Sequence, residues 1–195
     1  MRGELRPGLD YRRMRLFVAI PLGAAVVDEL SAIRTRLQSR EDGLRWAAAE
    51  SWHVTLQFLG KTNEEQYECV VARLREVRSA PTPIALEGLG FFERAGVFFA
   101  GVRVTLELVQ LQQRVTEATE FCGFVPEARS FNPHITLARI KGRARRNGLN
   151  ALRSKLHGQP RFTRFVAKEF LLFESFPGSE GSRYEIRERF ALKDG

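Results

Sequence analysis

The sequence predicts an α+β fold of two pseudo-symmetric lobes, each a mostly antiparallel sheet with flanking helices, around a central cleft. Short segments with an apolar period of two occur along the chain together with amphipathic segments of helical period. Nearly the same four-residue phrase also occurs twice, as HVTL at residues 53–56 and HITL at residues 134–137, 81 residues further on. A duplicated unit would place these phrases across a pseudo-twofold axis, so that they meet in one cleft.

The first half of the chain reads as strand, helix, two strands and helix. A strand over 15–20 stops at Pro21, an amphipathic helix lies near 23–39, and strands follow over 44–47 and 53–59. Residues 62–65, TNEE, have the form of a capping box and open a second helix, which the prolines at 81 and 83 end. The side chains expected to face inward are Val26, Leu30, Ile33 and Leu37 of the first helix and Tyr67, Val70, Val71, Leu74 and Val77 of the second.

The second half repeats this order with a hairpin at its start. Strands over 84–92 and 97–104 flank the turn at 93–96, and a helix with Leu108, Leu111, Val115, Ala118 and Cys122 inward ends at Gly123. The second motif strand, a basic loop, a short helix around 149–156 and strands over 165–173 and 184–192 complete the chain. We expect residues 1–14 to be an N-terminal extension and residues 15–195 to form a single bilobal domain.

Composition narrows the class of protein and its partners. The 195 residues are 44% apolar, carry a net charge of +8 and hold no apolar run near the roughly 20 residues of a membrane span. The N-terminus lacks the apolar core of a secretory signal, and Cys69 and Cys122 are expected to be buried free thiols, which together favour a reduced cytoplasmic protein. Basic residues cluster directly after the second motif, which favours RNA as a partner over simple solvation.

Each repeated phrase delivers an imidazole and a hydroxyl to one surface. In a strand alternate side chains share a face, so His53 lies with Thr55 and His134 lies with Thr136. In the first strand, the apolar row on the other face is expected to hold Trp52, Val54, Leu56 and Phe58, while Gln57 joins the polar row. The chain holds three histidines, and the third, His157, has no threonine partner and is read as a surface residue. Two proton-transfer groups and two hydroxyl donors suit metal-independent cleavage of a phosphodiester.

The two motifs, in the contexts SWHVTLQFLG and FNPHITLARIKG, resemble the two-histidine phosphoesterase superfamily. Within it, the sequence is most similar to the RNA 2′,3′-cyclic phosphodiesterases, also called 2′–5′ RNA ligases. The opening RLFVAIPL at 15–22, the TLAR that ends the second motif, and FLLFES at 170–175 followed by Tyr184 are also similar to that family. The resemblance extends from about Arg15 to the end of the chain.

The resemblance implies the reaction and the roles of the site residues. It implies hydrolysis of RNA 2′,3′-cyclic ends to 2′-phosphomonoesters, with His53 as proton donor to the 3′-oxygen and His134 as proton acceptor; sequence alone does not assign these two roles. Thr55 and Thr136 would donate hydrogen bonds to the non-bridging oxygens. No cofactor is implied, and ATP-independent 2′–5′ ligation would be the reverse reaction. The partners are RNAs with cyclic ends, tRNA fragments among them; a monomer without membrane contact is expected.

Five further residues are candidates for binding substrate. The resemblance suggests that Arg139 binds phosphate, although strict alternation from His134 puts it on the opposite face unless the strand bulges or ends first. Tyr184, Phe17 and Trp52 are candidates for stacking a base, with core packing the alternative for the last two because they lie in apolar rows. Arg143, in the basic run after the second motif, is a candidate for contacting the RNA backbone.

Other classes fit the sequence less well. A metallohydrolase would want a third ligand near the histidine pair, and neither motif has Asp or Glu at ligand spacing. The chain has no GxxxxGK[ST] phosphate loop and no nucleotidyl-transfer lysine motif, which argues against an ATP-dependent ligase. A non-catalytic module that binds RNA or nucleotides remains the alternative, although it would not need both histidines and both threonines.

Overall fold

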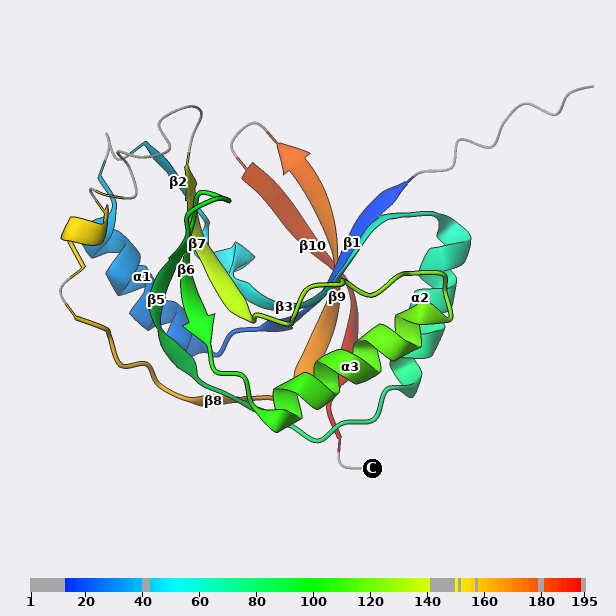
Figure 1. The fold of residues 1–195 in the computed structure, drawn as a ribbon. Coiled ribbons are helices and arrows are strands. Elements are labelled where there is room, and N and C mark those ends of the chain that lie inside the picture. The colour runs from blue at the N-terminus through cyan, green and yellow to red at the C-terminus, as the bar shows by residue number, and fades with distance from the viewer. Residues whose placement is uncertain are drawn as a thin grey trace, which may run out of the picture.

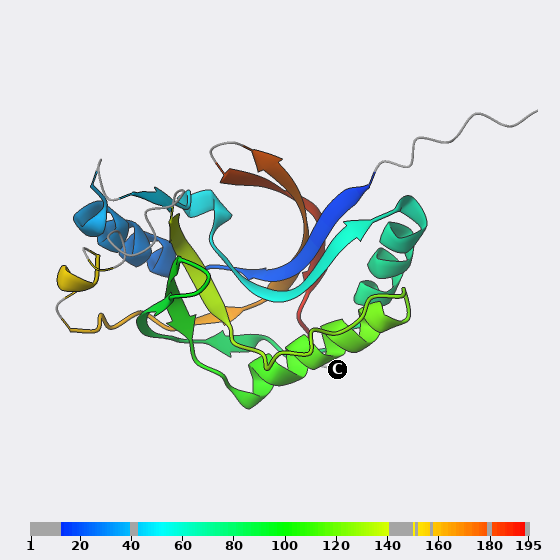
Figure 2. The same cartoon turned by 45° about the horizontal axis from the view of Figure 1, so that its top comes forward.

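The computed structural model describes residues 13–39, 43–140, 150, 152–156, 158–178 and 181–193. In this part of the chain, one four-stranded sheet has the order β10-β9-β1-β3 and a second has the order β2-β7-β6-β5, while β4 and β8 form a two-stranded sheet. Every strand pair is antiparallel. The two larger sheets form the two lobes, and both views show the chain passing back and forth between them (Figures 1 and 2). The predicted fold class is therefore confirmed.

The first sheet is built from the two ends of the chain and the first motif. Its strands are β1 (Met14–Pro21), β3 (His53–Thr62), β9 (Glu169–Gly178) and β10 (Gly181–Ala191). The second sheet holds β2 (Leu44–Trp46), β5 (Leu86–Phe92), β6 (Val97–Val102) and β7 (His134–Ile140), and β4 (Thr82–Ile84) pairs with β8 (Phe165–Ala167). The two motif strands β3 and β7 therefore belong to different sheets, yet they lie in contact with each other.

The helices bury the apolar faces that the sequence predicts. Helix α1 (Ala24–Leu37) buries all four of its predicted inward residues and lies beside the second sheet (Figure 2). Helix α2 (Glu64–Glu76) packs against α3 (Leu106–Glu120), and these two helices contact β10 and β3 of the first sheet. The sheets and helices share one continuous apolar core. Within the described residues, no helix is long and apolar enough to cross a membrane.

Several element boundaries differ from the sequence prediction. The capping box of α2 is formed by Asn63 and Gln66 rather than by Thr62 and Glu65, because the helix begins one residue later than the TNEE pattern implies. The strand predicted over 165–173 is two strands, β8 and β9, and β4 was not predicted. In the region of the predicted helix at 149–156, residues 150 and 152–154 are helical. Residues 1–12 and the basic run 141–149 lie outside the described residues.

The two cysteines do not match the prediction of free thiols. Cys69 of α2 and Cys122, just after α3, form a disulfide that joins positions 53 residues apart. Cys69 is helical as expected, whereas α3 ends at Glu120, before Cys122. The sequence does not show that α2 and α3 pack side by side and bring the two sulfurs together. The disulfide therefore ties the two outer helices of the first lobe to each other.

Candidate active site

Both motif histidines are held by the same local hydrogen bond. The ring Nδ1 of His53 lies 2.7 Å from the carbonyl oxygen of Ser51, and Nδ1 of His134 lies 2.9 Å from the carbonyl oxygen of Asn132. A carbonyl oxygen only accepts, so each Nδ1 carries the proton and donates it. Nε2 is then the nitrogen that each imidazole has available for proton transfer.

The burial pattern is the same along the two motif strands. From His53 to Phe58 the residues are half-buried, buried, half-buried, buried, buried and exposed, and the same sequence of classes runs from His134 to Arg139. The histidine and threonine of each motif are the half-buried residues, on the face opposite the core, as the alternation predicts. The two faces meet, because Thr55 and His134 line one groove of about 470 Å³.

Aromatic rings surround each imidazole. The His53 ring centroid lies 4.7 Å from that of Phe17, 5.9 Å from Phe173 and 5.3 Å from Tyr184. The His134 ring makes edge contacts with Phe92 at 4.9 Å and Phe99 at 5.5 Å. These contacts fix the orientation of both rings and restrict water around His53.

The pKa of His53 is lowered from 6.5 to about 4, chiefly by burial; the hydrogen bond to Ser51 opposes the shift and the electrostatic effect of His134 adds to it. His53 is therefore neutral at pH 7 in the protein without ligand.

Arg139 lies on the same face as His134 and Thr136 because β7 bulges before it. Val97 of β6 faces Arg139 and Phe98 faces Ala138, but Phe99 faces Thr136, so Leu137 is the extra residue. Leu137 and Ala138 are both buried, and the alternation restarts with Arg139 on the side of His134. Of the two arrangements that the sequence left open, the bulge is the one that occurs.

Arg45 is a functional candidate that the sequence analysis missed. It faces Arg139 directly across the β2–β7 pair, so the two side chains share one face. Its side chain lies against the β9–β10 hairpin, about 4.0 Å from where a side chain at Gly181 would begin. Among the described residues, neither guanidinium has a hydrogen-bond or ion-pair partner. A strand of three residues gave no pattern from which this position could be read.

The structure separates the remaining candidates. Trp52 is 5% exposed and lies in the apolar core, the alternative that its apolar row favoured. Phe17 is also buried, at 3% exposed, but it lies outside that core, on the face of His53 and Thr55. Phe17 instead packs against the ring of His53. Tyr184 is half-buried at the edge of the His53 ring and stays a candidate for contacting substrate. Arg143 and His157 lie outside the described residues.

Two positions in the first motif strand were assigned to the wrong face. Phe58 was expected in the buried apolar row and is 59% exposed, while Gln57 was expected in the polar row and is buried, where it accepts a hydrogen bond from Thr119 of α3. A bulge at Leu56 is the cause, because Val18 of β1 faces Gln57 whereas Ala19 faces Thr55. Comparison of the two motifs gives a signal for this exposure. Phe58 and Arg139 are both the sixth residue of their motifs, and an arginine is not expected in a buried row.

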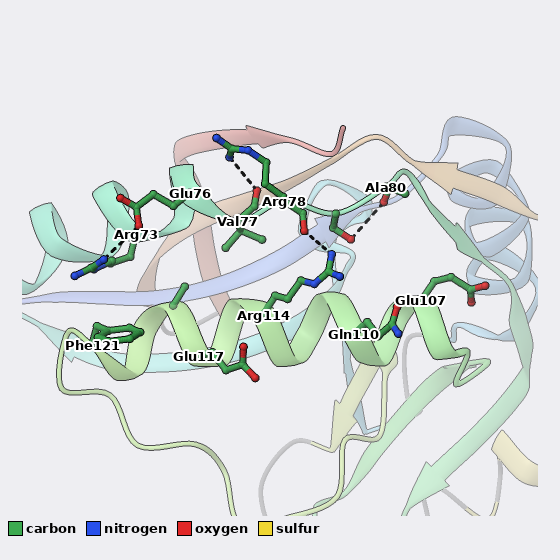
Figure 3. Close-up of a pocket in the computed structure, with 12 residues that line it drawn as sticks. Arg73, Glu76, Val77, Arg78, Ala80, Glu107, Gln110, Arg114, Glu117 and Phe121 are labelled. Atoms are coloured by element: carbon green, nitrogen blue, oxygen red, sulfur yellow. Dashed lines mark hydrogen bonds and ion pairs between the residues drawn. The ribbon is translucent and has the colours of Figure 1, made fainter. Parts of the chain in front are cut away.

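A larger groove of the described structure lies elsewhere, between α2 and α3, with a volume of about 690 Å³ (Figure 3). It holds neither motif histidine. Its cations are already engaged within the protein: Arg114 donates to the carbonyl oxygen of Arg78, and Arg73 pairs with Glu76 and lies over the ring of Phe121. The groove beside the two motifs is therefore the better candidate for the active site. The described residues also contain no group of three or more side chains suited to hold a metal ion.

Paired His-x-Thr strands from two lobes, facing one groove, define a two-histidine phosphoesterase. Residues 23–174 match the model of the "2′-5′ RNA ligase superfamily", and the chain belongs to that family. It is 35% identical over 133 residues to an RNA 2′,3′-cyclic phosphodiesterase of Thermotoga maritima, covering 66% of this chain and 71% of that protein. A protein of the same name from Archaeoglobus fulgidus is 31% identical over 175 residues, or 88% of this chain and 97% of the relative.

Solved structures agree with this assignment. A structure of Escherichia coli LigT complexed with 3′-AMP superposes with a TM-score of 0.78 at 27% identity, covering 94% of this chain and all of that chain. The structure of a Thermus thermophilus protein, TT0787, gives a TM-score of 0.76 at 26% identity, with 93% and 99% coverage.

Proposed function

We propose that this protein is an RNA 2′,3′-cyclic phosphodiesterase that opens cyclic phosphate ends to 2′-phosphomonoesters. The observation that carries the proposal is the matched pair of motifs, each with an imidazole whose Nδ1 is fixed by a backbone carbonyl and a threonine on the same face. The relatives from Thermotoga maritima and Archaeoglobus fulgidus carry the name of this activity, which supports the same conclusion.

The reaction needs one proton donor and one proton acceptor at the same time. In the proposed mechanism, Nε2 of His134 takes a proton from the attacking water, and Nε2 of His53 gives a proton to the departing 3′-oxygen. Each such transfer contributes about 10²–10⁴ in rate. The hydroxyls of Thr55 and Thr136 donate hydrogen bonds to the non-bridging oxygens, where negative charge builds up in the transition state.

The low pKa of His53 makes its role as proton donor depend on the substrate. At about 4, the pKa leaves His53 neutral in the free protein at pH 7. A bound cyclic phosphate brings a negative charge next to the ring, and an opposite charge within about 4–6 Å raises the pKa of an imidazole. Substrate binding would therefore favour protonation of His53, which then donates this proton to the departing 3′-oxygen. Protonation of the donor is in this way coupled to the presence of the phosphate.

Arg45 and Arg139 are proposed to hold phosphate. Two like charges directly opposite each other on neighbouring strands destabilise a sheet, unless an anion lies between them. Guanidinium groups bind phosphate oxygens with paired, charge-assisted hydrogen bonds, which would offset this cost. The pair lies beyond Thr136 along the cleft, so a phosphate of the RNA chain could bind there while the cyclic end lies between the histidines.

The substrate is proposed to be RNA with cyclic ends, tRNA fragments included, bound by a monomer in the cytoplasm. The net charge of +8 supports a polyanionic partner. The Cys69–Cys122 disulfide removes free thiols as a reason for a cytoplasmic location, whereas RNA as the substrate still favours one. ATP-independent joining of 2′–5′ ends would be the reverse reaction in the same site.

Product analysis with histidine variants tests the proposal. We expect the wild-type protein to convert a cyclic-ended oligonucleotide to the 2′-phosphate, also in excess EDTA, because the histidines supply both proton transfers. His53→Ala and His134→Ala should each lower kcat by about 10² or more, and the double variant should be little worse, since the two groups act as a unit. A predominance of 3′-phosphate would reverse the assigned roles. Binding without turnover would favour the alternative of a non-catalytic RNA-binding module.

A further inference from the structure

The Cys69–Cys122 disulfide lies between the two histidine motifs in the path of the chain. The first motif strand, β3, ends at Thr62 and is followed by α2, which carries Cys69, while Cys122 precedes the segment that leads into β7 (Figures 1 and 2). His53 is 16 residues from Cys69 and Cys122 is 12 residues from His134, whereas the two histidines are 81 residues apart along the chain. The disulfide therefore shortens the covalent connection between the two halves of the site.

On one side, the disulfide is next to a direct contact with the first motif strand. Thr119, three residues before Cys122, is buried, and its hydroxyl donates a hydrogen bond of 2.7 Å to Oε1 of Gln57. Gln57 lies two residues after Thr55 on β3. The backbone N–H of Cys122 in turn donates to the carbonyl oxygen of Thr119 at 3.0 Å. A displacement of Cys122 would therefore be transmitted to Thr119 and from there to β3 beside Thr55.

On the other side, the disulfide holds the start of the segment that orients His134. This segment, 123–133, joins the end of α3 to β7, and the carbonyl oxygen of Asn132 in it accepts the hydrogen bond from Nδ1 of His134. Residues 125–130 are all exposed, so the core does not hold them in place. The segment is instead held at its start, where Phe124 is buried and the disulfide is two residues away.

The relative position of the two motifs depends on contacts of this kind. In the described part of the chain, β3 and β7 belong to different sheets, so no ladder of backbone hydrogen bonds fixes one strand against the other. The reaction needs both imidazoles in register with one phosphate, and a misplacement of about 1 Å can cost about 10²-fold in rate. A covalent tie near both motifs would keep this geometry.

We propose that the Cys69–Cys122 disulfide is a positioning element of the active site, which makes the activity depend on redox state. The inference rests on the proposed function and adds a regulatory feature to it. With the disulfide intact the two motifs are held in register, whereas in the dithiol form they are held less precisely and turnover is slower. An enzyme of this kind in the cytoplasm would be most active under oxidising conditions.

The switch is an ordinary thiol–disulfide exchange with a dithiol reductant. Cys69 is half-buried and Cys122 is 9% exposed, so the reductant thiolate attacks the sulfur of Cys69 and releases the thiolate of Cys122. The second thiolate of the reductant then attacks the mixed disulfide and releases Cys69. Two electrons and two protons pass to the protein, which gains two thiols, and the reductant leaves as a cyclic disulfide.

The test compares turnover of adenosine 2′,3′-cyclic phosphate by the oxidised protein and by the protein reduced with dithiothreitol. Both forms are measured at a temperature at which their circular dichroism spectra agree, so that unfolding does not contribute. We expect reduction to lower kcat about tenfold with a smaller change in KM, and reoxidation to restore kcat. Cys69→Ser and Cys122→Ser should have the kcat of the reduced protein with or without reductant.

Two further variants separate positioning from helix packing. Thr119→Val removes the hydrogen bond to Gln57 and should lower kcat with the disulfide intact, whereas Thr119→Ser keeps the hydroxyl and should retain it. Arg114→Gln is the matched control, because Arg114 of α3 donates to the carbonyl oxygen of Arg78, just after α2. It loosens the same pair of helices without cutting the disulfide, so its kcat and its response to reductant should equal those of the wild type.

A readout without turnover comes from the NMR signals of the His53 and His134 rings, which should both shift on reduction. Equal kcat values in the two redox states would overturn the proposal and leave a disulfide that only stabilises the fold. A loss in Arg114→Gln as large as that in Cys69→Ser would also overturn it, because helix packing would then be the cause. Failure of the oxidised protein to hydrolyse any cyclic-ended probe would overturn the proposed function; ring signals unmoved by reduction would overturn the positioning independently of activity.

Discussion

Replacing His53 with glutamine should remove a pH-dependent part of the free energy of unfolding. The pKa of His53 is about 4 in the folded protein, mainly because burial disfavours the imidazolium, and 6.5 is its ordinary value in an unfolded chain. Between these values the unfolded chain binds a proton that the folded protein does not. Acidification therefore favours unfolding: the stability contributed by neutral His53 is fully present above pH 6.5 and is lost as the pH falls toward 4.

The size of the effect follows from the shift. One pKa unit corresponds to about 1.4 kcal/mol, so the shift from 6.5 to about 4 sets an upper limit of roughly 3 kcal/mol. The ring of His53 is half-buried and keeps some contact with solvent, which reduces the expected loss to about 1–3 kcal/mol. Chemical denaturation at pH 7 and pH 4 measures it, and the wild type should lose this much more stability than His53→Gln.

A matched variant separates this effect from general acid denaturation. His134→Gln removes the neighbouring charge and leaves the buried ring of His53 in place, so it should keep most of the extra loss. An NMR titration of the imidazoles should show the His53 midpoint near 4, and inorganic phosphate should move it upward if phosphate loads the proton donor. Equal losses of stability in the wild type and His53→Gln, or an NMR midpoint near 6.5, would refute the reasoning.

Two further predictions concern the disulfide and the arginine pair. Reduction of Cys69–Cys122, which closes a loop of 53 residues, should lower the free energy of unfolding by about 2–4 kcal/mol, and Cys69→Ser should show the same loss with no further effect of reductant. A wild type insensitive to reductant would contradict this. Arg45→Gln and Arg139→Gln should each lower kcat/KM for a cyclic-ended oligonucleotide about tenfold and reduce its salt slope by about one. Arg103→Gln, whose guanidinium binds Glu87, is the control; identical behaviour of all three variants would exclude a phosphate-binding pair.

The sequence alone predicted most elements of the fold and the candidate reactive side chains. Apolar residues at helical spacing predicted the buried face of α1 without error, because an amphipathic helix is set by local periodicity. The same reasoning put His53 with Thr55 and His134 with Thr136 on one face, since no bulge interrupts these short stretches. The repeat of the motif indicated two lobes and one shared site.

Only the tertiary structure shows which face of the strand is occupied by the residues that follow each motif threonine. Alternation of faces is a local rule, and it fails where one strand carries an extra residue relative to its neighbour. The extra residue is Leu56 where β3 pairs with β1, and Leu137 where β7 pairs with β6. That is why Phe58 and Arg139 face the substrate side and Gln57 does not. The disulfide, the Arg45–Arg139 pair and the low pKa of His53 likewise depend on segments far apart in the chain, whose approach in space the sequence pattern does not encode.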